Sequence, residues 1–372
     1  MIIILTQCFP PRLGGIESLM YNLSLNLAEN NKVLVLADGH DSKKDNFFDI
    51  KIKEKIEIQR VNGLKFLRRR KKIKLLKSVV DSNDVSVVIG DSWKSFELAV
   101  EFLNSSKIPT ICLAHGNELI KKNNNQFNRL QSTLNSVSSI VCNSNFTKTL
   151  VEQIDIKNPI IKRIYPGAED LSLIKEMFIP NVNGNPILLT LSRLEIRKGH
   201  REVILSVAKL KEQFPNIQYI IAGTGIESDK LKESVRNLNL EKNVIFVGNV
   251  NNMQKNFLLN RATLMVMPTI DETSRRSIEG FGISYIEASF FSVPSITSNI
   301  GGTSEAVLHN KTGIVIENIQ DLYDNLKLLL TDNILLSKLG KNAQERASKD
   351  FKWKIIIKEY LNLISELNRI KS

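Results

Sequence analysis

The stretch MIIILTQCFPPRLGGIESLMYNLSLNLAENNKVLVLA, residues 1–37, decides the fold. Its apolar run Met1 to Leu5 has the length of a buried strand, and the turn-rich loop Pro10 to Gly15 follows it. Ile16 to Glu29 has the periodicity of an amphipathic helix, and Lys32 to Ala37 is a second strand-length run. Strand, loop, helix and strand within about 35 residues predict a βαβ unit with parallel strands and a right-handed crossover.

The same alternation continues through the first half of the chain. A length of 372 residues exceeds what one hydrophobic core usually organises, so two domains are expected. Further strand-length apolar runs of this half are Val85 to Gly90, Thr110 to Ala114, Ile140 to Asn143 and Ile160 to Ile164.

Residues 166–186 are rich in proline, glycine and asparagine, and we place the domain boundary there. Beyond it, strand-length runs again alternate with helical segments, and three helices are expected at the end of the chain. We predict an α/β protein with two doubly wound, Rossmann-like domains, 1–168 and 169–351, facing across a cleft at the carboxyl ends of their strands. The expected strands are Ile187 to Leu191, Tyr219 to Ala222, Val244 to Val247, Leu264 to Met267, Ser295 to Thr297 and Gly313 to Ile316.

The composition limits the classes of partner. A net charge of +12 favours an anionic ligand or surface, but no nucleic-acid readout motif accompanies it, so we expect no nucleic-acid partner. The three cysteines, Cys8, Cys112 and Cys142, form no metal or redox motif and indicate a reducing compartment. No run of about 18 apolar residues is present, so we expect a cytoplasmic protein without a membrane span.

The segment Glu279-Gly-Phe-Gly-Ile-Ser-Tyr-Ile-Glu287 carries two carboxylates around a glycine-rich turn that leads into a helix. We expect Glu279 above the amino terminus of that helix and Glu287 inside it, so that the two acids address different parts of one ligand. The unpaired N–H groups of the helix start favour an anion such as a diphosphate between them.

The loop after the strand Ile187 to Leu191 carries Arg193 and Lys198. Two cations at the carboxyl end of a strand are placed to clamp the negative charge that develops on a departing diphosphate. Without further context, a solvated basic loop is an equal interpretation.

Together these motifs resemble the family-four glycosyltransferases of GT-B fold. The resemblance spans nearly the whole chain and is closest in Glu279 to Ser289 to the branch with the bacterial phosphatidylinositol mannosyltransferases. It implies that residues 352–372 pack back on the first domain. The motifs, in family order, are Phe9 to Glu17, Arg193 with Lys198-Gly199, Ala222 to Gly225, Glu279 to Glu287, and Gly301-Gly302 with Glu305.

The resemblance also implies a role for each site residue. Arg193 and Lys198 bind the donor diphosphate, Glu287 accepts hydrogen bonds from the ribose, and Glu279 contacts hydroxyls of the transferred sugar. His115 contacts that sugar near the reacting face, so the implied catalytic residues are His115, Arg193, Lys198 and Glu279. The remaining implied donor-binding residues are Gly15, Gly223, Gly225, Val247, Phe281, Gly282, Ile283, Gly301 and Gly302.

Members of this family generally retain the anomeric configuration without an enzyme nucleophile. The resemblance implies that the acceptor attacks from the face that the diphosphate leaves, and that a diphosphate oxygen helps to take the acceptor proton. The chain has no DxD motif, so we expect no metal and no other cofactor besides the nucleotide sugar.

The residues themselves also allow a different function and ordinary structural roles. Gly14-Gly15 lacks the GxGxxG spacing, although Asp38 near the end of the second strand supports an NAD-binding dehydrogenase. Taken alone, His115 is more often a hydrogen-bonded structural histidine. Gly301-Gly302 is equally a loop that caps a helix, and Arg275-Arg276 is interpreted as surface loop.

Leu64 to Val80 combines a basic face with an apolar stripe. It predicts a helix that lies on an anionic membrane through Arg68, Arg69, Arg70, Lys71 and Lys72, or a solvated helix whose stripe faces its own sheet. In the lipid-directed relatives the first domain carries the acceptor site and the membrane contact, which favours the membrane.

We therefore expect a retaining, metal-independent hexosyltransferase that uses a nucleotide sugar such as UDP-glucose or GDP-mannose. The expected acceptor is a lipid at the cytoplasmic face of the membrane, where the enzyme is peripheral. A saccharide transferase of polysaccharide or lipopolysaccharide assembly is the competing interpretation, and a sugar-nucleotide epimerase is a further one.

Overall fold

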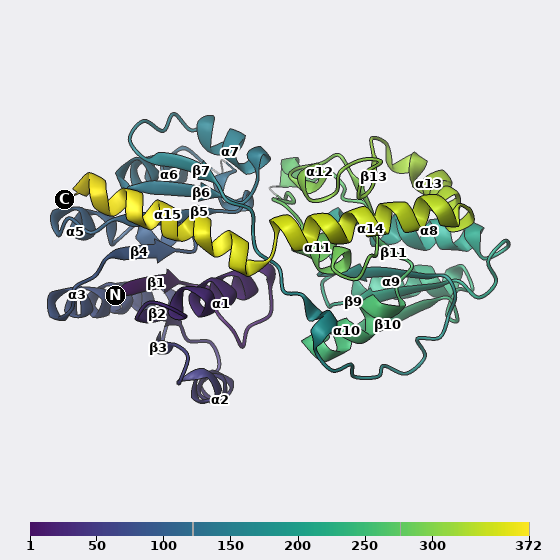
Figure 1. The fold of residues 1–372 in the computed structure, drawn as a ribbon, viewed down its shortest axis with the longest axis horizontal. Helices are drawn as coiled ribbons and strands as arrows, with labels where there is room; N and C mark the ends of the chain where they lie inside the picture. The colour runs from purple at the N-terminus through teal and green to yellow at the C-terminus, as the bar shows by residue number, and fades with distance from the viewer. Residues whose placement is uncertain (121–122, 276, 372) are drawn as a thin grey trace. The chain divides into compact units, whose positions relative to one another are not determined.

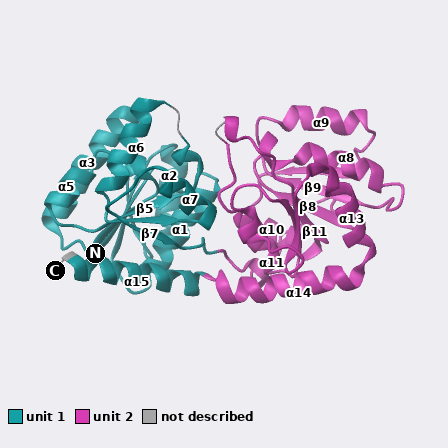
Figure 2. Cartoon of the chain, turned by 90° about the horizontal axis from the view of Figure 1, so that it is seen from above, with its two compact units in different colours: residues 1–167, 353–372 teal, residues 168–352 magenta. Residues whose placement is uncertain are grey.

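The structure, a computed structural model, describes residues 1–120, 123–275 and 277–371. The chain forms two compact units: residues 1–167 with 353–372 are unit 1, and residues 168–352 are unit 2 (Figure 2). Each expected domain boundary lies one residue from these limits. Both units are α/β with one parallel sheet, which confirms the predicted fold class.

The sheet of unit 1 has seven strands in the order β3-β2-β1-β4-β5-β6-β7. Every strand pairs in parallel, and β1 lies between β2 and β4 (Figure 1). The strands are β1 (Ile2–Thr6), β2 (Val33–Asp38), β3 (Glu57–Val61), β4 (Val87–Gly90), β5 (Thr110–Ala114), β6 (Ser139–Cys142) and β7 (Ile160–Arg163).

Strand β3 was not expected from the sequence. Its residues Glu57 to Val61 lie at the edge of the sheet and include only two apolar side chains, Ile58 and Val61, of which only Val61 is buried. Two separated apolar side chains are too few to form the apolar run by which the other strands were found.

Helices cover both faces of the sheet of unit 1. Because successive strand side chains point to opposite faces, Ile2 and Ile4 join one core cluster while Ile3 and Leu5 join the other. The first cluster includes helix α15, which packs on this sheet (Figure 1). The helices are α1 (Gly15–Ala28), α2 (Ser42–Ile52), α3 (Lys65–Ser82), α4 (Trp93–Phe96), α5 (Val100–Ser105), α6 (Asn124–Ser136), α7 (Asn145–Glu152) and α15 (Trp353–Lys371), with a 3-10 turn at Asn117–Leu119.

The sheet of unit 2 has six parallel strands in the order β10-β9-β8-β11-β12-β13. All six correspond to runs expected from the sequence. They are β8 (Ile187–Leu191), β9 (Gln218–Ala222), β10 (Val244–Gly248), β11 (Leu264–Met267), β12 (Ser295–Ser298) and β13 (Gly313–Ile316).

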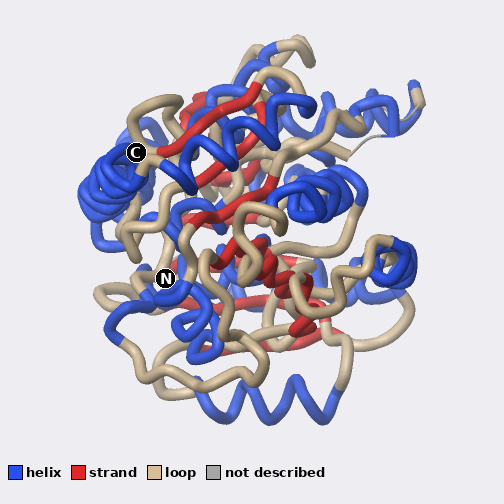
Figure 3. Tube along the Cα trace, turned by 90° about the vertical axis from the view of Figure 1, so that its right-hand side faces the viewer, coloured by secondary structure: helices blue, strands red, loops and turns tan. Residues whose placement is uncertain are grey.

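Helices also flank the strands of unit 2, drawn blue around red in Figure 3. One core cluster joins Leu188 and Tyr219 of the sheet to Val203 and Val207 of α8. The helices are α8 (His200–Leu210), α9 (Ser228–Asn237), α10 (Asn252–Arg261), α11 (Ile283–Ser289), α12 (Thr303–Ala306), α13 (Leu322–Thr331) and α14 (Asn333–Asp350), with 3-10 turns at Leu171–Leu173, Ile196–Lys198, Thr273–Arg275 and Ile319–Asp321.

The strand order of each unit creates a topological switch point, at which successive connections leave on opposite sides. In unit 1 the chain leaves β1 toward β2 and β4 toward β5, on opposite sides; in unit 2 it does the same at β8 and β11. Open parallel sheets bind ligands outside the carboxyl ends of the strands at such switch points. Within the described residues, no helix is both long and apolar enough to cross a membrane.

Candidate functional site

The switch point of unit 2 brings together three of the predicted site residues. Arg193 and Lys198 follow β8, and Glu279 follows β11, the neighbouring strand. Residues 81 positions apart in the sequence therefore meet, since Nζ of Lys198 donates to Oε2 of Glu279 at 2.5 Å.

A second cation, Arg197, shares this carboxylate. Its Nη1 donates to the same Oε2 of Glu279, and its Nε donates to Oε2 of Glu195 at 3.1 Å. Arg197 and Lys198 are both buried, with 5% and 8% of their surface exposed. Buried charges persist only when they are paired, so this cluster holds two cations in the interior of the site.

Burial acts to raise the pKa of Glu279, but Lys198 and Arg197 outweigh it and hold this pKa below its ordinary value. The carboxylate is therefore ionised at neutral pH. Burial lowers the pKa of Lys198, and Arg197 acts in the same direction against the attraction of Glu279. An additional anion at Lys198 would favour its charged form.

Arg193 differs from its neighbours in exposure. Its side chain is 65% exposed, and Nη1 lies 2.9 Å from Oε1 of Glu195. Glu195 thus lies between a buried and an exposed guanidinium. An exposed guanidinium at the mouth of the site is free to turn toward an anion at low cost.

The predicted glycines shape the backbone around these side chains. Gly223 has φ +144°, and a Cβ there would lie 1.9 Å from the carbonyl oxygen of Ser192. A Cβ on Gly225 would lie 2.3 Å from the carbonyl oxygen of Leu194. The turn after β9 therefore packs directly on the loop after β8. Val247 is half-buried at the end of the adjacent strand β10.

Gly301 and Gly302 contact the backbone of Glu279. The N–H of Gly302 donates to the Glu279 carbonyl oxygen at 2.9 Å, and Gly301 has φ +69°. A Cβ on Gly301 would lie 2.1 Å from that carbonyl oxygen. The loop after β12 therefore closes on the segment that carries the carboxylate.

Helix α11 begins at Ile283, directly after Gly282, which has φ +98°. Ile283 is half-buried, and the Phe281 side chain is buried with its ring 5.7 Å from that of Phe351. The side chain of Phe281 therefore anchors the turn in the interior. The predicted donor contact of Phe281 would be made by its backbone.

Glu287 lies inside α11, and Nζ of Lys255 in α10 lies 2.7 Å from its Oε1. Burial acts to lower the pKa of Lys255, but Glu287 outweighs it and raises this pKa. Each of the two predicted carboxylates thus has its own lysine partner. The structure brings Glu279 and Glu287 to opposite ends of one short segment, as expected from their spacing.

Sequence reasoning missed Arg197 and Lys255. Arg197 stands beside Lys198 in the same basic loop, so its sequence position already indicated a place in the site. No motif around Lys255 indicates a role in the site, because only the fold brings α10 against α11.

His200, to which the sequence assigned no role, is a buried structural residue. Its Nδ1 lies 2.9 Å from Oη of Tyr219, and its Nε2 lies 3.2 Å from Oγ of Ser192. Burial lowers the pKa of His200 to about 4, so the ring is neutral at physiological pH. It connects the first turn of α8 to β9 and to the loop that carries Arg193.

The predicted residues Gly15 and His115 belong to unit 1. Gly15 starts α1, and a Cβ there would meet no atom within 4 Å, so the space beside its Cα is open. His115 follows β5; its Nε2 lies 2.9 Å from the Asp91 carbonyl oxygen, and its N–H donates to Glu118 at 2.6 Å. His115 lies directly after the carboxyl end of β5, and Gly15 lies at the start of the first helix, as expected.

The basic segment of α3 differs from the prediction. Lys72 is buried, donates to the Thr6 carbonyl oxygen at 2.6 Å and pairs with Asp38, so the prediction that it contacts a membrane is wrong. Arg68 donates to the Gly39 carbonyl oxygen at 2.8 Å, and Arg69 pairs with Glu97.

Two of the five predicted cations, Arg70 and Lys71, are exposed. The apolar stripe is divided as well: Leu76 is buried in the core, whereas Leu64 and Phe66 are 77% and 61% exposed. Arg276 and the Arg275 side chain lie outside the described part of the chain.

Two family models match the chain, "Glycosyltransferase Family 4" over residues 13–170 and "Glycosyl transferases group 1" over residues 175–346. Among curated proteins, a glycogen synthase of Mycobacterium tuberculosis is 30% identical over 171 residues, which are 45% of this chain and 40% of that protein. The matched region thus spans less than half of this relative. A GDP-mannose-dependent monoacylated alpha-(1-6)-phosphatidylinositol monomannoside mannosyltransferase of Corynebacterium glutamicum is 23% identical, with 97% of each chain covered.

A solved structure shows the shared fold. HepE of Anabaena, crystallised in complex with UDP, superposes with a TM-score of 0.80 at 19% identity, over 98% of this chain and 99% of that one. This likeness agrees with the two-sheet architecture described above, which is the GT-B fold.

The depressed pKa of His200 predicts a pH-dependent stability. As the pH falls below 6.5, the unfolded chain binds a proton at this ring that the folded chain does not bind until about pH 4. Between pH 7 and 4.5 the wild type should therefore lose about 2 kcal/mol more unfolding free energy than His200→Gln. Urea unfolding at both pH values measures this difference, and equal losses in the two proteins would contradict it.

Proposed function

The chain belongs to the glycosyltransferases, and from that premise we propose that it transfers a hexose-type sugar from a nucleoside-diphosphate sugar to an acceptor hydroxyl. We further propose that the reaction retains the anomeric configuration and needs no metal ion. The buried cluster of Arg197, Lys198 and Glu279 at the switch point of unit 2 is the observation that carries this proposal.

The cations of this cluster supply what a departing diphosphate requires. As the bond to the sugar breaks, negative charge grows on the diphosphate, and cations in a site shielded from water stabilise it strongly. Lys198 is already fixed and buried, and exposed Arg193 joins it from the surface. Stabilisation that is in place before the reaction costs no reorganisation at the moment of bond breaking.

The two carboxylates bind the neutral parts of the donor. Because Lys198 and Arg197 keep Glu279 ionised, it is an acceptor for sugar hydroxyls beside the diphosphate. Glu287, oriented by Lys255, accepts hydrogen bonds from the ribose. His115 contacts the transferred sugar, the acceptor attacks on the face that the diphosphate leaves, and a diphosphate oxygen takes its proton.

The leading acceptor is a lipid at the cytoplasmic membrane face. The Corynebacterium relative matched over nearly its whole length is named for a phosphatidylinositol mannoside acceptor, and α3 exposes Arg70 and Lys71 beside the apolar Leu64 and Phe66. Exposed apolar side chains flanked by cations favour an anionic membrane surface.

A soluble saccharide acceptor in polysaccharide or lipopolysaccharide assembly is the second candidate. The glycogen synthase likeness favours it, although that match covers a minority of either chain. The dehydrogenase interpretation is set aside by the family, and Asp38, which supported it, is buried in an ion pair with Lys72.

Variants of unit 2 test the donor site. Lys198→Ala should lower kcat by roughly 100-fold or more, because it removes a cation from the departing diphosphate. Glu287→Ala should weaken donor binding by roughly tenfold or more, because it removes a charged acceptor of ribose hydrogen bonds. Thermal-shift and calorimetric screening of nucleotide sugars identifies the donor, and turnover with that donor measures both variants. Lys230→Ala, in which an exposed lysine that pairs with Glu227 is lost, is the matched control; normal turnover in both test variants would reject the site.

The products test the proposed chemistry. Proton NMR of an early reaction sample should show the same anomeric configuration in the product as in the donor. Turnover should be unchanged by a chelator of divalent cations, since Arg and Lys side chains neutralise the diphosphate. Inversion, loss of activity with the chelator, or an altered sugar released without an acceptor would each contradict the proposal.

Vesicle binding tests the lipid acceptor. Arg70→Gln combined with Lys71→Gln should lower the partition coefficient for anionic vesicles by roughly tenfold and leave neutral vesicles unaffected. Lys354→Gln with Lys358→Gln, two exposed positions of α15, is the matched control. Equal co-sedimentation of wild type and the α3 variant would count against membrane contact through this helix.

A further inference from the structure

Arg197 binds two carboxylates at once. Its Nη1 donates to Oε2 of Glu279, and its Nε donates to Oε2 of Glu195 at 3.1 Å. The residue is buried, and its carbonyl oxygen accepts the N–H of Ile270, in the loop after β11, at 2.8 Å. Side chain and backbone therefore hold this guanidinium in place, so it has little freedom to turn toward a ligand.

Lys198 is held less completely. Its ammonium group has three N–H donors, and one of them contacts Oε2 of Glu279 at 2.5 Å. Within the described residues this is its one side-chain contact. The remaining donors are available to a diphosphate, so Lys198 can contact the carboxylate and the donor at the same time.

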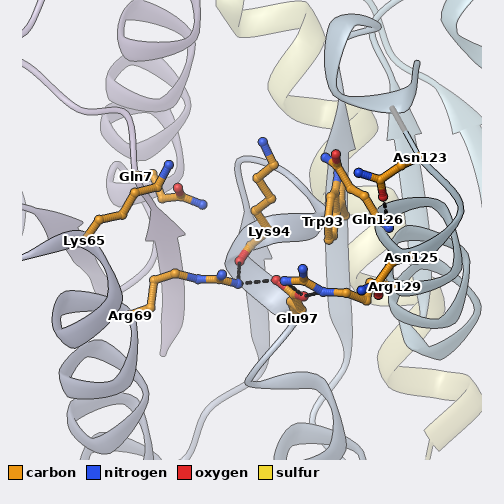
Figure 4. Close-up of a pocket in the computed structure, with 10 residues that line it drawn as sticks. All are labelled: Gln7, Lys65, Arg69, Trp93, Lys94, Glu97, Asn123, Asn125, Gln126 and Arg129. Atoms are coloured by element: carbon orange, nitrogen blue, oxygen red, sulfur yellow. Dashed lines mark hydrogen bonds and ion pairs between the residues drawn. The ribbon is translucent and has the colours of Figure 1, made fainter. Parts of the chain in front are cut away.

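The two cations meet Glu279 at a single oxygen. Both contacts fall on Oε2, and among the residues that the structure describes Oε1 accepts no hydrogen bond. The carboxylate of Glu97, which lines a cavity of about 430 Å³ in unit 1, is occupied differently, since Arg69 and Arg129 approach it on separate oxygens (Figure 4). Glu97 thus uses its whole carboxylate for the protein, whereas Glu279 keeps one oxygen for a ligand.

A bound diphosphate would place negative charge beside Glu279, on the other side of the Lys198 ammonium. Like charge raises the pKa of a carboxyl group, and burial acts in the same direction on Glu279. A carboxyl group that takes up a proton loses part of its capacity to accept hydrogen bonds. A cation that stays on Glu279 offsets both effects, and Arg197 is placed to do so because Glu195 holds its other end.

Among the described residues, the other titratable groups near Glu279 do not supply a second charge of this kind. Burial raises the pKa of Tyr285 in α11, so its hydroxyl stays neutral, and it donates to the Met267 carbonyl oxygen at 2.7 Å. Glu195 has the same sign as Glu279. Arg193 is exposed, and its Nη1 lies 2.9 Å from Oε1 of Glu195.

We propose that Arg197 is a positioning residue that stays on Glu279 while the donor binds and keeps this carboxylate charged and fixed for the hydroxyls of the transferred sugar. Lys198 bridges the same carboxylate and the diphosphate. The part in sugar recognition rests on the proposed transferase function, whereas the coupling of Arg197 to the charge of Glu279 does not.

Carbon-13 NMR of the Glu279 carboxyl group tests the coupling without any turnover. In the full chain labelled at glutamate, the resonance of Glu279 is the one that is lost in Glu279→Gln. Arg197→Gln should raise the pKa of Glu279 by about one pH unit or more, because one of two opposite charges is removed while the burial remains.

Further variants control this titration. Arg197→Lys should return the pKa of Glu279 toward that of the wild type, because it restores a cation. Arg201→Gln, in which an exposed arginine of α8 that pairs with Glu202 is lost, should leave it unchanged. Thermal unfolding checks that each variant is folded, and Arg197→Met takes the place of Arg197→Gln if the latter does not fold, since methionine fills a buried position without charge.

Turnover with the identified donor tests the role in the reaction. In Arg197→Gln the acid limb of kcat should move to higher pH by about one unit, since kcat is lost as Glu279 takes up a proton and this now occurs at higher pH. A merely structural role would lower kcat by the same factor at every pH. In the Glu279→Gln background, Arg197→Gln should lower kcat by about twofold at most, because the group through which Arg197 acts is already neutral.

The outcomes separate this inference from the proposed function. An unchanged Glu279 titration in Arg197→Gln, or an equal effect of Arg197→Gln on kcat in the wild-type and Glu279→Gln backgrounds, would overturn the inference. A shifted titration in a chain that turns over no nucleotide sugar would refute the proposed function and support the coupling. Turnover of a nucleotide sugar with an unchanged titration would do the reverse.

Discussion

One oxygen of Glu279 receives both Arg197 and Lys198, and the arrangement of unit 2 around its switch point depends on this contact. Each of these charges would be costly to bury alone, so the cluster stays charged only while all its members are in place. It joins the ends of two strands that are neighbours in the sheet but distant in sequence. Glycines in the loops around it have no room for a Cβ, as the close approach of Gly301 to the Glu279 carbonyl oxygen shows.

The two units use the same topology with different electrostatics. At the switch point of unit 1 the buried carboxylate of Asp91 is satisfied by backbone N–H and hydroxyl donors, and the cations surround a separate cavity beside it. At the switch point of unit 2 the cations bind the buried carboxylate directly. In unit 1, Arg69 and Arg129 pair with a different carboxylate, that of Glu97, whereas in unit 2 Arg197 and Lys198 both pair with Glu279.

Helix α3 shows why amphipathicity alone was ambiguous. Its middle turns place Leu76 in the core and Lys72 on Asp38, as expected of a helix that covers its own sheet. Its first turns leave Phe66 exposed and place the Arg70 guanidinium over that ring, 4.2 Å from its centre. A helical period identifies a face but not the surface that the face meets, so the sequence could not decide which part of the helix covers its own sheet.

The sequence by itself determined the two α/β units, the twelve strands that appear as apolar runs, and the segments that carry Lys198, Glu279 and Glu287. These features are local: strand length, helical period and glycine-rich turns are written in consecutive residues. Only the tertiary structure decided that Arg197 shares the carboxylate of Glu279, that Lys255 orients Glu287, that Lys72 is buried, and that Arg69 and Arg129 meet at Glu97. Each of these pairings joins side chains from separate elements, and the partner of a charge is set by which strand ends and helix faces the sheet order brings together.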